Sequence, residues 1–124
     1  MNINEMCKKA HENAVAHGWW DEERPFSEQI ALMHSELSEA LEEYRDGREL
    51  DDVYFTCDDE AESKEQELCK ICEYGKPEGI PIELADVIIR IADTCGRYGI
   101  DLEQAIRVKM EYNKNRSYKH GKKF

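Results

Sequence analysis

The fold of this chain is decided by residues 82–93, which read Ile-Glu-Leu-Ala-Asp-Val-Ile-Ile-Arg-Ile-Ala-Asp. As a helix this stretch is apolar nearly all round, which predicts a central, buried helix. Its charged residues follow the spacing i, i+3, i+7, i+10 and therefore share one stripe: Glu83, Asp86, Arg90 and Asp93. Because carboxylates on a buried helix are costly without a positive partner, the stripe indicates a cation-binding site.

A second pair of acids supports this interpretation. Residues 36–39 read Glu-Leu-Ser-Glu within another amphipathic helical pattern. Two such helices side by side bring together four carboxylates, which are Glu36, Glu39, Glu83 and Asp86. Oxygen ligands alone select hard cations, Mg²⁺ or Mn²⁺, over zinc. A Glu-x-x-Glu pair by itself is common on solvated helix faces, but an acid pair inside an apolar helix is much less so.

Helical patterns account for most of the remaining chain and predict an all-α, four-helix fold. The expected helices cover residues 2–18, 27–46, 81 to Gly96 or Gly99, and 101–115. Ser27 and Asp101 are the candidate N-terminal caps of the second and fourth helices. No clear strand pattern appears.

Length and composition limit the architectures and the partners that this chain can have. A chain of 124 residues with 40% apolar and 36% charged residues predicts one domain, residues 1–124, with a modest core. Such a domain is expected to complete its core by self-association. The net charge of −11 argues against binding a nucleic-acid polymer. The sequence shows no signal peptide and no long apolar run, which predicts a cytoplasmic protein without a membrane partner.

Two segments depart from the helical pattern. An insert at about residues 47–78 is acidic and contains cysteines, whereas the tail at about residues 116–124 is basic. Cys57, Cys69 and Cys72 have the spacing of a partial zinc knuckle, so Zn²⁺ is a candidate ligand of the insert. A fourth ligand is missing from the segment, and surface thiols are the alternative interpretation.

Three motifs together resemble the MazG-like branch of the all-α nucleoside triphosphate pyrophosphohydrolases. They are His-Ser-Glu-Leu-Ser-Glu-Ala-Leu-Glu-Glu-Tyr-Arg at residues 34–45, Glu-Leu-Ala-Asp at 83–86 and Lys-Met-Glu-Tyr-Asn-Lys-Asn-Arg at 109–116. The resemblance covers about residues 10–120 without the insert, which is longer than the usual linker. It implies an all-α fold, assembly into homodimers or homotetramers, and Mg²⁺-dependent cleavage of nucleoside triphosphates to monophosphate and pyrophosphate.

The same resemblance assigns roles to residues of this chain. It implies Glu36, Glu39, Glu83 and Asp86 as metal ligands, and Lys109, Asn113 and Arg116 as phosphate-binding residues. Glu36 or Glu39 is the expected general base toward the attacking water. The three phosphate-side residues are spaced i, i+4, i+7 along one helix face, for which a plain solvated surface is the alternative.

Trp19 and Trp20 follow a helix-ending glycine and are candidates for stacking on a nucleobase. The alternative for them is an anchor in the core or in a subunit interface. Two function classes then remain. The first is a nucleotide pyrophosphohydrolase. The second is a non-catalytic, dimeric helical module that binds a nucleotide or metal as a regulator. The complete set of acids and phosphate-side residues favours the enzyme.

Overall fold

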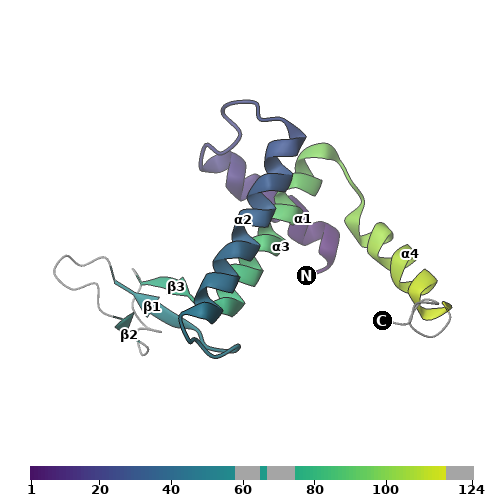
Figure 1. Cartoon of the computed structure of the whole chain (residues 1–124). Helices are drawn as coiled ribbons and strands as arrows, with labels where there is room; N and C mark the ends of the chain where they lie inside the picture. The colour runs from purple at the N-terminus through teal and green to yellow at the C-terminus, as the bar shows by residue number, and fades with distance from the viewer. Residues whose placement is uncertain (58–64, 67–74, 117–124) are drawn as a thin grey trace. The chain divides into compact units, whose positions relative to one another are not determined.

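The computed structural model describes residues 1–57, 65–66 and 75–116, and within them the chain is mostly helical (Figure 1). The elements in chain order are α1 (Ile3–Ala16), α2 (Phe26–Arg45), β1 (Tyr54–Thr56), β2 (Glu65–Gln66), β3 (Lys76–Glu78), α3 (Ile80–Tyr98) and α4 (Leu102–Lys114). The prediction of four helices is thereby confirmed. The chain divides into two compact units, Glu23–Arg90 and the combination of Met1–Glu22 with Ile91–Phe124.

In the unit Glu23–Arg90, α2 runs beside the first half of α3 (Figure 1). The helix α2 begins directly after Pro25, whose carbonyl accepts from the backbone N–H groups of Glu28 and Gln29. Ser27 lies inside this helix, so its predicted capping role is wrong, and no side chain of the described residues caps the start of α2. The helix ends before Gly47, whose φ of +92° suits glycine far better than other residues.

A small antiparallel sheet with the order β2-β1-β3 follows α2. The sequence shows no strand pattern there, because strands of two or three residues are too short to show an alternation. Strand β3 leads through Gly79 into α3. A side chain at Gly79 would place its Cβ 2.2 Å from the carbonyl oxygen of Asp52, so this junction requires glycine.

In the other unit, α1 and the end of α3 share a core of small residues, Cys7, Ala92 and Cys95. Gly99, with φ +66°, follows the last residue of α3 and decides between the two ends predicted for this helix. Asp101 caps α4 by accepting from the backbone N–H of Gln104 at 3.0 Å, as predicted. Its carboxylate also accepts from Asn4 of α1 at 2.9 Å.

The prediction that α3 is buried throughout is wrong. Leu84, Ile88 and Ile89 are each about half exposed, at 45%, 51% and 50%. Much of the apolar stripe of α2 is exposed as well, at Ile30, Leu37, Leu41 and Tyr44. No large side chain among the described residues is fully buried, which is the physical consequence of a short chain with long helices. Within the same residues, none of the helices combines the length and apolarity needed to cross a membrane.

Candidate metal centre

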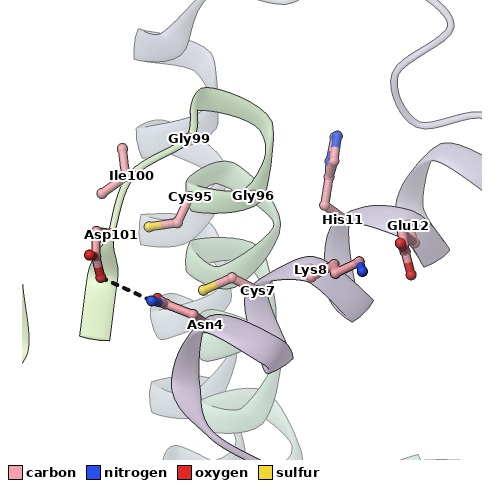
Figure 2. Close-up of a pocket in the computed structure, with 10 residues that line it drawn as sticks. All are labelled: Asn4, Cys7, Lys8, His11, Glu12, Cys95, Gly96, Gly99, Ile100 and Asp101. Carbon is pink, nitrogen blue, oxygen red and sulfur yellow. Dashed lines mark hydrogen bonds between the residues drawn. The ribbon is translucent and has the colours of Figure 1, made fainter. Parts of the chain in front are cut away.

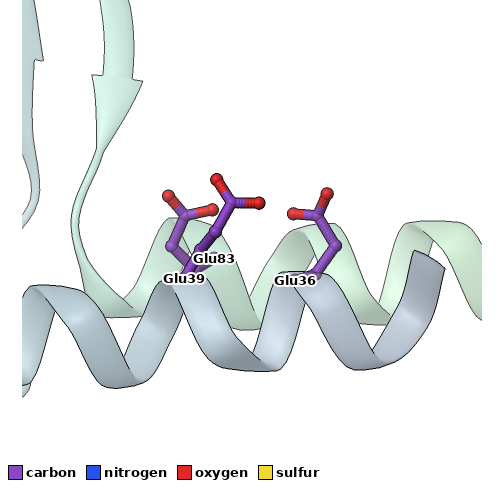
Figure 3. Close-up of side chains that lie close together, drawn as sticks. All are labelled: Glu36, Glu39 and Glu83. Atoms are coloured by element: carbon purple, nitrogen blue, oxygen red, sulfur yellow. The ribbon is translucent and has the colours of Figure 1, made fainter. Parts of the chain in front are cut away.

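Three glutamates from two helices converge in the unit Glu23–Arg90. Glu36 and Glu39 of α2 and Glu83 of α3 each direct one carboxylate oxygen into a group whose members lie within 4.8 Å of one another (Figure 3). The spacing i, i+3 places the first two on one face of α2, and the pairing of the helices brings Glu83 to them. Glu36 is buried, Glu83 is half-buried and Glu39 is exposed, so the group has one side open to solvent.

Asp86, the fourth predicted ligand, lies beside this group rather than in it. Its charge contributes to the raised pKa of Glu83. Burial and the nearby charge of Glu36 raise the pKa of Asp86 above its ordinary value, whereas Arg90 opposes the shift. The structure thus brings three of the four predicted acids together and leaves Asp86 as their half-buried neighbour.

The electrostatics of Glu83 are dominated by burial and by neighbouring negative charges. Burial raises the pKa of Glu83 to about 7, and repulsion from Glu39, Asp86 and Glu36 adds to the effect. The protonated form of this carboxyl group is therefore favoured at a higher pH than for an ordinary glutamate. A divalent cation would take the place of that proton and would offset the repulsion. The donor set, composed of carboxylate oxygens alone, fits Mg²⁺ or Mn²⁺.

Arg90 provides one positive charge at the edge of the cluster. Its Nε donates to Glu36 Oε1 at 3.1 Å, across α3 and α2. The spacing of the sequence predicts Arg90 on the acidic stripe of α3, but it does not predict the pairing with Glu36. The sequence feature that could have indicated a contact with the acids is the position of Arg90, four residues after Asp86 on the same stripe. The contact orients one oxygen of the most buried glutamate of the group.

The acidic row on α2 continues one turn further, to Glu43, and meets the insert there. The hydroxyl group of Tyr54, on β1, donates to both carboxylate oxygens of Glu43, at 2.9 Å for Oε2. The guanidinium group of Arg48 lies 3.6 Å from the centre of the Tyr54 ring. The charge of Glu43 contributes to the raised pKa of Glu83. Sequence reasoning missed both residues, although Glu43 is spaced i+4 from Glu39.

The predicted phosphate-binding residues belong to the other unit, on and just after α4. Lys109 and Asn113 are exposed, whereas Arg116 is half-buried. The Lys109 ammonium group lies 5.0 Å from the centre of the Tyr112 ring, and the Arg116 guanidinium group lies 5.2 Å from it. Tyr112 therefore gathers two of the three predicted residues around one exposed aromatic ring.

The two tryptophans differ in their surroundings. Trp20 donates from Nε1 to Asp93 at 2.8 Å and meets the ring of His11 edge to face, with 5.7 Å between centroids. Arg97 covers one face of Trp20 at 4.8 Å. These contacts make Trp20 an anchor within its unit. Trp19 is 58% exposed, and it is the tryptophan with surface available for a nucleobase.

The candidate zinc ligands are only partly described. Cys57 follows β1 at the end of a described segment, whereas Cys69 and Cys72 lie outside the described residues.

No family model, no curated protein and no solved structure matches this chain. The resemblance to MazG-like enzymes therefore rests on the three motifs and stays a prediction. The helical fold and the three converging glutamates are compatible with it.

Proposed function

We propose that this protein is a Mg²⁺-dependent nucleoside triphosphate pyrophosphohydrolase that converts a nucleoside or deoxynucleoside triphosphate to its monophosphate and pyrophosphate. The observation that carries the proposal is the convergence of Glu36, Glu39 and Glu83 from two helices. Three acids at this distance repel one another, and the pKa of Glu83 is raised to about 7. A divalent cation bound among them would offset this repulsion.

In this proposal Glu36, Glu39 and Glu83 would hold the cation, and Asp86 would add negative charge beside Glu83. Mn²⁺ is an alternative ion, because its ligand preference is similar. Such an ion neutralises phosphate oxygens and lowers the pKa of a bound water. Phosphoryl transfer depends mainly on this neutralisation and on alignment, so metal ligands that are all acids fit this chemistry.

Two glutamates were candidates for the general base, and their contacts favour Glu39. Glu36 is buried, and one of its oxygens already accepts a charge-assisted hydrogen bond from Arg90. Glu39 is exposed at the open side of the group. We therefore assign Glu39 to accept the proton of the attacking water, and Glu36 to orientation of the cation.

The basic residues of α4 supply the positive charge that a triphosphate needs on a protein of net charge −11. Lys109 and Arg116 flank Tyr112, and Asn113 adds an amide donor to the same helix. We assign all three to the phosphate groups and Trp19 to the base. A nucleotide-pool housekeeping role in the cytoplasm is part of the proposal.

The exposed apolar faces of α2 and α3 support assembly into a homodimer or homotetramer. Leu37 and Leu41 on α2, with Leu84 and Ile88 on α3, recur at helical spacing and are 45–55% exposed. Side chains of this kind in such number mark a surface that another chain covers. We propose that a second copy of this chain covers it.

The decisive experiment measures products. The purified protein is incubated with a panel of nucleoside and deoxynucleoside triphosphates and Mg²⁺, and the products are separated by ion-exchange chromatography. Monophosphate and pyrophosphate in equal amounts, lost on chelation of the metal, support the proposal. Diphosphate and orthophosphate as the first products would refute cleavage between the α- and β-phosphates. Absence of turnover with every nucleotide and with either Mg²⁺ or Mn²⁺ would refute the enzymatic assignment.

A further inference from the structure

The unit formed by Met1–Glu22 and Ile91–Phe124 contains a pair of thiols that the proposed reaction does not use. These are Cys7 of α1 and Cys95 of α3, and each thiol influences the pKa of the other. They are 4% and 6% exposed, and together with Ala92 they make up the buried cluster of this unit. Two cysteines in one buried cluster, brought together from sequence positions 88 residues apart, are a feature of the fold rather than of local sequence.

The backbones of the two helices are close at this point. A Cβ atom built on Gly96, the neighbour of Cys95, would lie 2.7 Å from the carbonyl oxygen of Cys7 and 2.6 Å from Cβ of His11. Glycine therefore permits α1 to approach α3 more closely than any other residue would. A disulfide requires Cα atoms within about 7 Å of each other, and a close helix crossing of this kind favours that condition.

The pair is also reachable from solvent. Cys7 and Cys95 both line an open pocket of about 440 Å³, whose wall includes the polar residues Asn4, Lys8 and Asp101. Figure 2 shows the two sulfur atoms on α1 and α3 with Asn4 and Asp101 beside them. A small oxidant has room in this pocket, since a single water occupies about 30 Å³ of liquid.

We propose that Cys7 and Cys95 are a covalent redox site, at which a hydroperoxide converts the two thiols to an intramolecular disulfide. One sulfur attacks the peroxide, so that the O–O bond breaks, an alcohol or water leaves and a sulfenic acid forms. The second sulfur then attacks the sulfenic sulfur, the S–S bond forms and water leaves with the remaining proton. The two electrons lost by the thiols reduce the peroxide, which completes the balance. The site is independent of the proposed nucleotide chemistry.

The resting state of the pair is the dithiol. Burial raises the pKa of both cysteines, and a thiol reacts only through its thiolate, so oxidation is slow and needs sustained peroxide. Once formed, the disulfide closes a long loop of chain and links α1 covalently to α3. Cross-links of this length stabilise the folded state mainly by restricting the unfolded chain.

The test uses the whole protein with Cys57, Cys69 and Cys72 replaced by serine, so that only the proposed pair can react. After treatment with hydrogen peroxide and blocking of residual thiols, the denatured protein should have lost two hydrogens in mass and bound no blocking reagent. Peptide mapping should join the Cys7 peptide to the Cys95 peptide, and dithiothreitol should reverse the change. The midpoint of thermal unfolding should rise by roughly 5–15 °C.

Matched variants serve as the control. Cys7→Ala and Cys95→Ala in the same background should show no rise of the unfolding midpoint after peroxide treatment. The wild-type chain is mapped in parallel, so the result stands even if a variant does not fold. The proposal is overturned if both thiols remain reactive toward the blocking reagent, or if they oxidise to sulfinic acids without an S–S bond. It is equally overturned if wild-type mapping links them only to other cysteines.

Discussion

The hydroxyl group of Tyr54 donates to the carboxylate of Glu43, and this contact ties the first strand of the acidic insert to the row of acids on α2. Tyr54 pairs through its strand with Glu78 of β3, which leads within five residues to Glu83 of α3. Strand β1 therefore contacts α2 through Tyr54 and pairs with β3, which precedes α3. The helices α2 and α3 carry the glutamates of the candidate metal centre. The insert is a structural support of the site in this arrangement.

Substitution of Tyr54 by phenylalanine should test that support. The ring stays beneath Arg48, but Glu43 loses its donor, so the free energy of unfolding should fall by about 1–2 kcal/mol. Mn²⁺ affinity, measured by water-proton relaxation, should weaken about threefold, because Glu43 is no longer held in place. Tyr44→Phe is the control, since Tyr44 is on the same helix and is 60% exposed. Equal losses of stability and of Mn²⁺ affinity in both variants would show that Tyr54 does not support the site.

Replacement of Glu83 by glutamine should abolish turnover, with kcat/KM falling at least about 100-fold. The substitution retains volume but removes one charged oxygen from the converging group. Asp86→Asn should also abolish turnover while helix content, read by circular dichroism, stays near wild type. Glu42→Gln provides the matched control, because Glu42 is exposed on α2 and lies outside the group. Full activity of the Glu83 variant would contradict the assigned site.

The raised pKa of Glu83 predicts a specific pH dependence. Its value of about 7 in the folded chain exceeds the ordinary 4.5, so the folded state binds more protons between these values. Stability without metal should therefore decrease as pH rises from about 4.5 through 7. Mn²⁺ competes with the same proton, so its affinity should increase as pH rises through 7, with proton release measurable by calorimetry in two buffers. Both slopes should flatten in Glu83→Gln.

Removal of the Lys109 charge should impair both binding and chemistry. Lys109→Ala should raise the KM for the triphosphate and lower kcat, each by roughly 10-fold, because phosphate charge is present in the ground state and in the transition state. Lys114→Ala, on the same helix, should change both constants less than about twofold. If the two variants change KM and kcat alike, the loss reflects the total positive charge of α4. Lys109 then has no specific role in binding phosphate.

The exposed apolar face predicts a species larger than the 14.5 kDa chain in sedimentation equilibrium at micromolar concentration. Ile88→Glu should dissociate it, because a charge in a closed apolar interface is costly. Val15→Glu, at a similarly exposed position on α1, should not. A wild-type protein that sediments only as a 14.5 kDa species would contradict the proposed assembly.

Local sequence determined a large part of this architecture. The helical periods predicted four helices, Asp101 was recognised as the cap of α4, and Gly99 was one of two candidate ends of α3. The spacing i, i+3 placed Glu36 and Glu39 on one face. These properties depend on residues within one or two helical turns, where the backbone geometry is the same in every protein.

Only the tertiary structure decided which distant groups meet. Arg90 reaches Glu36 across 54 residues of sequence, and Tyr54 reaches Glu43 from a strand too short to show a period. It also decided that Ile88 is half exposed, although its helix reads as a core element. Periodicity states which residues share a face, but the partner of that face depends on how the helices pair and on whether the chain is long enough to cover it.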